Sequence, residues 1–183
     1  MRSTISATCI SALFALAGLT ACTTTAPQSQ SERVALEASA ASAVSRAKAT
    51  DPSIATILDG ADSYAVFPTV GKAAVAIGGA YGKGVVYEHG KFVGYCDLTQ
   101  ASIGLALGGQ SYTEIIVFKT PDALRRFKSG TLAFDAQATA VALRSGSGAN
   151  AKYSDGVAVF TMNEAGLMGE ASVGGQKFTY QPK

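Results

Sequence analysis

The sequence predicts an α+β fold that is mainly antiparallel β, either barrel-like or built as two packed sheets, with N-terminal helices and one short internal helix. Helical periodicity is confined to residues 31–60 and 121–130, and from residue 63 onward β-rich segments alternate with glycine. The chain has 183 residues, 48% of them hydrophobic and 15% charged. Because that length buries a sufficient core, we expect a single domain over residues 31–183.

The first 21 residues are typical of an export signal. A positively charged start, Met1-Arg2, precedes the apolar run 10–19, which is about half the ~20 residues that a membrane-spanning helix needs. The run ends in Leu19-Thr20-Ala21-Cys22, which resembles the bacterial lipobox. We therefore expect cleavage before Cys22 and attachment of acyl chains, palmitate among them, to make a lipoprotein.

Residues 22–30 predict a lipidated cysteine followed by a flexible tether, because the segment is small, polar and contains proline. Thr23, where an aspartate would retain the protein in the inner membrane, resembles outer-membrane sorting. We expect a bacterial envelope location, lipid-anchored in the outer membrane and facing the periplasm or the cell surface. Only Cys96 is then left as a free thiol, so the chain forms no intramolecular disulfide in the oxidising periplasm.

Two helices are predicted before the sheet. Ser29 and Glu32 have the spacing of a capping box and open an alanine-rich helix over 31–49, whose apolar face is thin. Asp51 and Pro52 then begin a short helix that stops at Gly60.

Glycines and turn residues divide the remaining chain into short strands. The predicted strands are 64–67, 72–78, 84–87, 91–98, 102–107, 112–119, 136–144, 156–161, 167–173 and 176–180. A turn at Glu88-His89-Gly90 and the short spacings predict meandering antiparallel hairpins. A helix from Thr120 to Gly130 interrupts the strands, and the glycine pairs that follow apolar residues are interpreted as sites of sharp bending.

Two binding classes are excluded. The net charge of +2 is too small for a nucleic-acid protein without a concentrated basic face. The glycine-rich run 78–84 is not a phosphate-binding P-loop, because Ile77 and Gly84 stand where that motif needs Gly and Ser or Thr.

Nothing in the sequence organises catalysis. His89 is the only histidine, lies in a predicted turn and has no nucleophile motif beside it, so we interpret it as an exposed turn residue. Cys96 lies within a predicted strand and is interpreted as a buried, inert thiol. One His and one free Cys do not make a zinc site, and no carboxylate spacing suits calcium. We expect a protein that is not an enzyme and has no metal and no cofactor.

The remaining candidate site is basic. Its members lie near glycine turns or on the internal helix, where they would offer positive charge to anionic lipid headgroups. The candidate headgroup-binding residues are Lys72, Lys83, Lys91, Arg125, Arg126 and Lys128. The alternative is a solvated face in which Asp122 pairs with Arg125 or Arg126.

Several motifs in a fixed order resemble the SYLF domain family. The first is YAVFPTVGK at 64–72, continued by AIGGAYGKG at 76–84. The later ones are QASIGLALGGQS at 100–111, EIIVF at 114–118, ALRRF at 123–127 and GEASVGG at 169–175. The resemblance covers nearly all of the chain after Thr50.

That resemblance implies a lipid-binding module, associated in eukaryotic members with phosphoinositides and in bacteria with exported proteins. The partner modules of eukaryotic members, SH3 and FYVE, are not in this sequence, so actin-linked functions are not carried over. In those relatives an N-terminal amphipathic helix is linked to membrane contact, whereas segment 31–49 has few bulky apolar residues.

Three hypotheses follow. The first is a non-enzymatic, lipid-binding envelope lipoprotein that recognises anionic, phosphoinositide-like headgroups. The second is a structural or interaction protein of the envelope that binds a protein partner. The third, a hydrolase that uses His89, lacks any supporting motif.

Overall fold

A computed structural model describes residues 25–132, 140–143, 146, 148 and 151–183. Residues 1–24, which include the expected signal sequence and Cys22, lie outside the described residues. The elements in chain order are α1 (Gln30–Thr50), α2 (Ser53–Asp59), β1 (Ser63–Glu88), β2 (Lys91–Phe118), α3 (Pro121–Lys128), β3 (Ala140–Ala142) and β4 (Val157–Pro182). The expected α+β class is confirmed, with N-terminal helices and one short internal helix.

The helices follow from local capping signals. Ser29 and Glu32 form the predicted capping box, and α1 begins one residue earlier than predicted. The backbone NH of Ser53 donates to the side chain of Asp51 at the start of α2, and Gly60 caps its end. The N-cap residue of α2 is Pro52, which makes no side-chain capping hydrogen bond, so Asp51 is not the N-cap. In α3 the hydroxyl of the N-cap residue Thr120 accepts from the NH of Ala123. Within the described residues, none of these helices is both long and apolar enough to cross a membrane.

The prediction of about ten short strands is wrong. Within the described residues there is one sheet of four strands in the order β1-β2-β4-β3, in which β1, β2 and β4 each extend over more than 25 residues and are antiparallel. The short strand β3 pairs parallel to β4, which the hairpin interpretation did not predict. Part of the predicted strand 136–144 lies outside the described residues.

The glycine pairs explain the difference in strand number. Backbone pairing continues through Gly78-Gly79, Gly108-Gly109 and Gly174-Gly175, where the predicted strands 72–78, 102–107 and 167–173 end. Glycine lacks a side chain to pack but keeps both backbone hydrogen-bonding groups, so it weakens a strand without ending it. The single predicted turn that does divide two strands is Glu88-His89-Gly90, with positive φ at His89 and Gly90.

β1 folds back so that its two halves lie against each other. A Cβ at Gly84 would lie 2.6 Å from the carbonyl oxygen of Val66, and one at Gly82 would lie 2.9 Å from Val70 Cγ2. Only glycine allows this approach of backbone to backbone. Of the two arrangements that the sequence left open, the structure therefore has a single curled sheet instead of two separate sheets.

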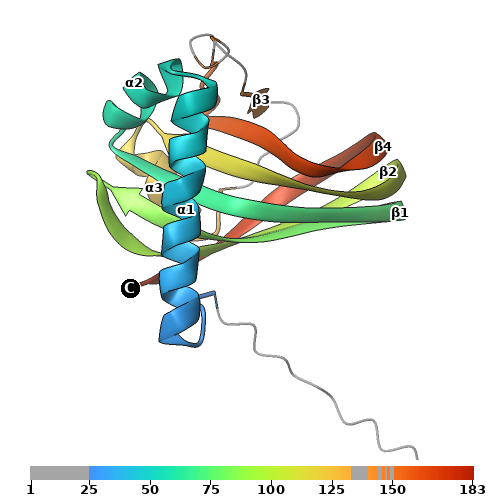
Figure 1. The fold of residues 1–183 in the computed structure, drawn as a ribbon, viewed down its shortest axis with the longest axis horizontal. Helices are drawn as coiled ribbons and strands as arrows, with labels where there is room; N and C mark the ends of the chain where they lie inside the picture. The colour runs from blue at the N-terminus through green and yellow to red at the C-terminus, as the bar shows by residue number, and fades with distance from the viewer. Residues whose placement is uncertain (1–24, 133–139, 144–145, 147, 149–150) are drawn as a thin grey trace, which may run out of the picture.

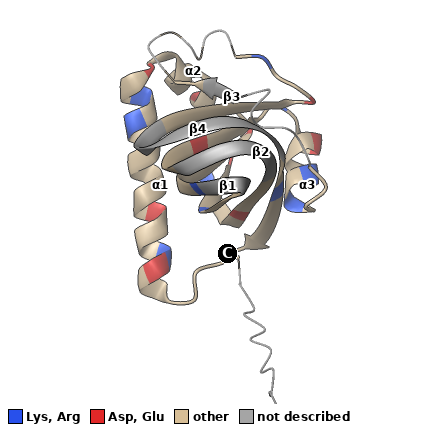
Figure 2. Ribbon diagram, turned by 90° about the vertical axis from the view of Figure 1, so that its right-hand side faces the viewer, with Lys and Arg blue, Asp and Glu red and all other residues tan. Residues whose placement is uncertain are grey.

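Side-chain alternation divides the buried residues between the inside of the curl and the outside. Phe67, Ile116 and Phe118 belong to the inner cluster, which α3 completes with Phe127. Val66, Ile115 and Val117 belong to the outer cluster, which α1 and α2 cover with residues such as Ala43 and Ile54. Figure 1 shows α1 crossing the strands steeply, and Figure 2 shows α1 and α3 on opposite sides of the curled sheet.

The last residues of the expected tether contact the sheet. Ala26 is buried, and its NH donates to Gln181 Oε1 at 3.0 Å. The hydroxyls of Thr25 and Thr179 lie 3.0 Å apart, and Lys83 Nζ donates to the carbonyl of Thr25 at 3.1 Å. The chain is therefore held against the body of the protein from Thr25 onward.

Candidate functional site

The β1–β2 turn and α3 bring four of the six predicted basic residues to one end of the sheet. Lys91 pairs in register with Glu88, and Lys128 Nζ lies 2.7 Å from the Glu88 carboxylate. The Lys128 ammonium also lies 5.3 Å from the centre of the Tyr180 ring. Arg125 and Arg126 are on α3 together with Lys128. We call Lys91, Arg125, Arg126 and Lys128 the basic end.

Asp122 partly neutralises the basic end. Arg125 and Arg126 both pair with this carboxylate, as the alternative interpretation predicted. Arg126 also donates to the carbonyl of Asp155 at 2.7 Å. The side chain of Arg125 nevertheless stays 73% exposed, and exposed ion pairs are weak. These cations can exchange Asp122 for an external anion at small cost.

Lys83 lies apart from the basic end. Its ammonium is 3.3 Å from the Asp97 carboxylate and 5.9 Å from the centre of the Tyr81 ring. Burial alone would lower the pKa of Lys83, but the hydrogen bond with Tyr81 and the charge of Asp97 outweigh it and raise the pKa.

Lys72 does not belong to the basic end either, because the residue is only 6% exposed. It lines a cavity of about 500 Å³ together with Tyr81 and Gln110. A largely buried lysine is a poor contact for a headgroup at a membrane surface.

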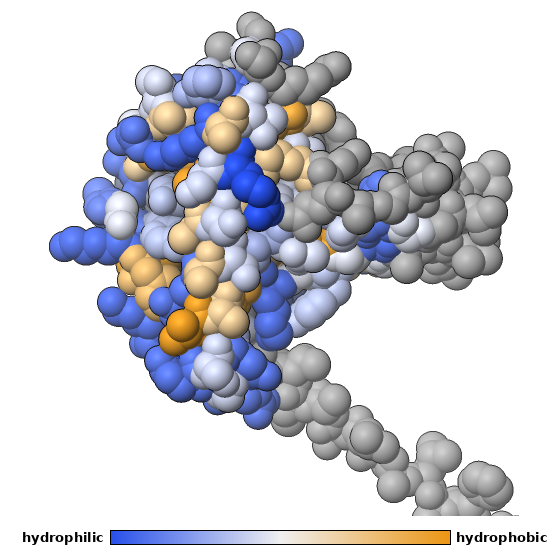
Figure 3. All heavy atoms as spheres, viewed as in Figure 1, coloured by the Kyte–Doolittle hydropathy of each residue, from blue (hydrophilic) through white to orange (hydrophobic). Residues whose placement is uncertain are grey.

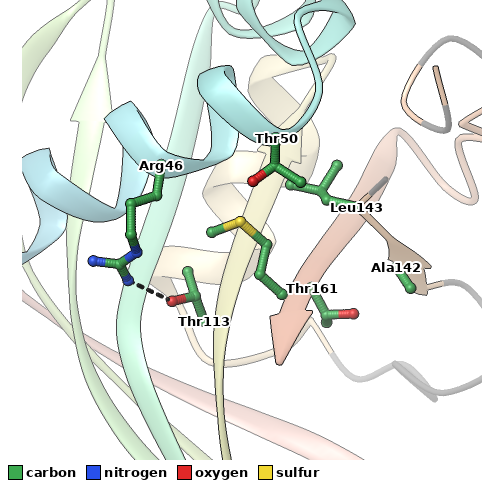
Figure 4. A pocket seen from close by; sticks show the side chains of 7 residues that line it. Arg46, Thr50, Thr113, Ala142, Leu143 and Thr161 are labelled. Carbon is green, nitrogen blue, oxygen red and sulfur yellow. Dashed lines mark hydrogen bonds between the residues drawn. The ribbon is translucent and has the colours of Figure 1, made fainter. Parts of the chain in front are cut away.

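A second cavity, which the sequence analysis did not identify, lies between α1 and the sheet and has a volume of about 640 Å³. Its lining residues are Arg46, Thr50, Thr113, Ala142, Leu143, Thr161 and Met162. Figure 4 shows the Arg46 side chain reaching from α1 to Thr113, with Leu143 and Ala142 on the opposite wall. We call this cavity the α1 groove. Helical spacing places Arg46 and Thr50 on one face of α1, but only the fold brings strand residues opposite them.

Asp51 secures the wall of the α1 groove. Its buried carboxylate accepts hydrogen bonds from the NH groups of Gly148 (2.6 Å), Gly146 (3.2 Å) and Ser53 (3.0 Å) and from the Ser53 hydroxyl (2.7 Å). Burial alone would raise the pKa of Asp51, but these hydrogen bonds outweigh it and lower the pKa to about 2. Asp51 thus ties the chain that follows Leu143 to the junction of α1 and α2.

The inside of the curl holds a buried carboxyl group, which the sequence analysis also missed. Glu114 is 1% exposed and accepts a 2.9 Å hydrogen bond from Gln176 Nε2, while its Oε1 has no partner. Burial raises the pKa of Glu114 to about 7, and the hydrogen bond from Gln176 offsets only part of this effect. The signal for this position is strand alternation within 112–119, which puts Glu114 on the same face as Ile116 and Phe118.

The two residues considered for catalysis lie where the sequence predicted. His89 is exposed in the turn, and its NH donates to the carbonyl of Asp62 at 2.7 Å. Cys96 is fully buried, and burial together with the charge of Asp97 raises the pKa of its thiol well above the usual value. A thiol that remains protonated and inaccessible is a poor nucleophile.

α1 has a small-residue face instead of a membrane-inserting one. Its buried side chains are Ala40, Ala43 and Ala47, which allow close packing on the sheet, and Val34 is its large exposed apolar residue at 56% exposure. The surface that carries α1 is a mixture of hydrophilic and small hydrophobic areas (Figure 3). This composition does not suit insertion of α1 into a bilayer.

Comparison with known proteins finds similarity to one protein family in the second half of the chain. Residues 99–183 match the family model described as "Ysc84: Las17-binding protein actin regulator", which is the SYLF domain. A curated relative, "Beta cell expansion factor A" of Aeromonas veronii, is 27% identical over 148 residues, covering 80% of this chain and 56% of the relative. The chain thus spans little more than half the length of that relative. The predicted resemblance is confirmed for the second half of the chain.

Proposed function

We propose that this chain, whose residues 99–183 carry a Ysc84 (SYLF) domain, is a non-enzymatic lipid-binding protein that recognises anionic, phosphoinositide-like headgroups through its basic end. The family is a binding-domain family, which supports binding in place of catalysis. The observation that carries the finer proposal is the gathering of Lys91, Arg125, Arg126 and Lys128 around one turn and one helix, against the two carboxylates Glu88 and Asp122.

Vesicle co-sedimentation tests the basic end. We would use the Cys22→Ala chain, so that acylation does not itself cause binding, with phosphatidylcholine vesicles and with vesicles containing phosphatidylglycerol or a phosphoinositide. Each Lys or Arg near an anionic surface contributes about 1 kcal/mol, so the double variant Lys91→Ala/Arg125→Ala is expected to bind roughly 25-fold more weakly. Added salt is expected to weaken binding as well.

Lys48→Ala is the matched control, because Lys48 is on α1, away from α3, in an exposed ion pair with Asp59. Its binding should equal that of the unmodified sequence. Equal binding to neutral and anionic vesicles, or no binding to either, would remove the headgroup mechanism.

We further propose that the mature protein is anchored in the bacterial envelope by acyl chains on Cys22, in the outer membrane and facing the periplasm or the cell surface. The lipobox-like order of residues 19–22 supports this proposal, and two or more acyl chains hold a protein stably on a bilayer. Mass spectrometry of the mature N-terminus should find the Cys22 sulfur modified. An unmodified sulfur in a freely soluble protein would contradict the anchor.

A protein partner is the second candidate function, and the family description favours it because it reads "Las17-binding protein actin regulator". A stoichiometric complex isolated from envelope extract with tethered chain, and unaffected by the Lys91→Ala/Arg125→Ala change, would support a structural or interaction role over headgroup binding.

A further inference from the structure

We infer that the outer face of the sheet beside Thr25 lies against the bilayer that holds the acyl chains of Cys22. The exposed residues of this face are Tyr81, Thr99 and Lys177, which we call the anchor face. This inference rests on the proposed acyl anchor and names the surface that the anchor brings to the lipid headgroups. The partner is a lipid surface.

The segment that precedes α1 is fixed to the sheet at two consecutive residues. The NH of Ala26 donates to Gln181 Oε1 at 3.0 Å, and Ala26 is 4% exposed. One residue earlier, the hydroxyl of Thr25 lies 3.0 Å from that of Thr179, and its carbonyl accepts from Lys83 Nζ at 3.1 Å. Figure 2 shows this segment running from the lower end of α1 to the underside of the curled sheet. Thr25 is therefore held at a defined point on the body of the protein.

The chain between this point and the anchor is short. Cys22 is three residues before Thr25, and an extended chain advances by at most ~3.6 Å per residue. Three residues therefore span at most about 11 Å. When Cys22 is acylated, the membrane surface that its acyl chains enter lies within that reach of Thr25.

The anchor face is one row of side chains across three strands. Tyr81 pairs in register with Thr99, and Thr99 pairs with Lys177, so the row crosses β1, β2 and β4. Their chain neighbours Leu98 and Phe178 belong to the inner cluster, so strand alternation turns the row to the outside of the curl. All three residues of the row are exposed.

This row lies next to the residues that hold the segment before α1. Thr179 is two positions from Lys177 on the same face of β4, a separation of about 7 Å. The contacts of the segment move along β4 from Gln181 to Thr179, which is the direction of Lys177. Because this separation is shorter than the reach of three residues, a bilayer that holds Cys22 can contact the anchor face.

The composition of the anchor face suits a headgroup layer. Tyr81 is 44% exposed, and its hydroxyl donates to the Asp97 carboxylate at 3.3 Å. A tyrosine with an exposed ring and a bonded hydroxyl is typical of membrane–water interfaces. Lys177 adds a cation that attracts anionic headgroups. Asp97 presents little opposing charge, because its side chain is 9% exposed and lies 3.3 Å from the Lys83 ammonium.

Fluorescence quenching by brominated lipid tests this inference in the acylated full chain. The sequence contains no tryptophan, so Tyr81→Trp gives the protein a single indole at the anchor face. In phosphatidylcholine vesicles with brominated acyl chains, this indole should lose fluorescence. Its emission should also shift to shorter wavelength than in the unacylated Cys22→Ala form. Thr99→Trp, a second reporter in the same row, should behave in the same way.

Tyr153→Trp is the matched control. Tyr153 is 38% exposed, and the Lys119 ammonium beside the start of α3 lies 5.2 Å from the centre of its ring. Figure 2 shows α3 on the opposite side of the curled sheet from α1. The indole at this position should keep its fluorescence in the same vesicles.

Two results would overturn the inference and leave the anchor standing. One is an equal loss of fluorescence in Tyr81→Trp, Thr99→Trp and Tyr153→Trp. The other is no loss in either reporter of the anchor face. Both apply to protein in which mass spectrometry finds Cys22 acylated.

Further outcomes separate this inference from the proposed function. An unmodified Cys22 sulfur would refute the anchor and the inference together. The double change Lys91→Ala/Arg125→Ala alters only the basic end, so it should leave the quenching of acylated Tyr81→Trp unchanged while weakening vesicle binding by the unacylated chain. Loss of the quenching in that variant would mean that the basic end orients the protein on the bilayer, and it would overturn the inference.

Discussion

Raising the pH from 5 to 8 is expected to destabilise the folded chain through Glu114. This side chain is buried inside the curled sheet, where burial raises its pKa from an ordinary value of 4.5 to about 7. Between these two values the folded protein holds a proton that the unfolded chain has released. Stability therefore decreases as the pH rises through this window and levels off above pH 7.

The magnitude follows from the difference between the two pKa values. Each pH unit between them costs about 1.4 kcal/mol, so the free energy of unfolding should decrease by about 3 kcal/mol from below pH 4.5 to above pH 7. Asp51 does not interfere, because its pKa of about 2 confines its contribution to more acidic solutions.

Urea unfolding at pH 5, 6, 7 and 8, followed by circular dichroism, measures this slope. Glu114→Gln keeps a neutral side chain that still accepts the hydrogen bond from Gln176, so the variant should lose most of the slope and be the more stable protein at pH 8. A wild-type stability that is flat or increases from pH 5 to 8 would refute the assignment of a buried, protonated Glu114. A slope that persists in Glu114→Gln would assign the effect to another group.

Other variants test the fold at the points where it closes. Asp51→Ala should destabilise the protein by about 2 kcal/mol or more, because it leaves the buried NH of Gly148 without its acceptor, and urea unfolding at pH 7 measures the loss. Because its pKa is lowered, the stabilisation by Asp51 is present above pH 4 and is lost as the pH falls toward 2, so unfolding of wild type and Asp51→Ala should converge there. Gly84→Ala should cost about 1–3 kcal/mol, since its Cβ would lie 2.6 Å from the Val66 carbonyl oxygen, whereas Gly175→Ala, with no atom within 4 Å of its Cβ, serves as the control and should have little effect. Equal midpoints for the two glycine variants in thermal unfolding would argue against the closure of β1 on itself.

The helices and the turn could be predicted because their signals are local. The Ser29–Glu32 capping box, the Thr120 cap of α3 and the Glu88-His89-Gly90 turn each act over a few residues, and the structure has all of them. The predicted strand boundaries are wrong because glycine residues do not end these strands. Whether glycine ends a strand depends on whether a partner strand continues beside it, and that partner is distant in sequence.

The candidate site shows the same division. Six basic residues could be named from the sequence, but only the fold gathers four of them beside α3 and buries Lys72. The sequence did not predict the α1 groove, because Arg46 lies beside Thr113 and Leu143, about 70 and 100 residues away in sequence, only in the folded chain. Such a groove exists only after α1 has packed across the sheet.

Local patterns in the sequence were enough to predict the fold class, the family resemblance and the helix boundaries to within a residue or two. Contacts between distant segments are needed to curl three long strands into one sheet, to bury Glu114 and raise its pKa, and to bring Arg46 opposite Leu143. The difference lies in sequence separation. Capping and turn formation depend on neighbouring residues, whereas burial and its effect on a charged group depend on segments that meet only when the whole chain has folded.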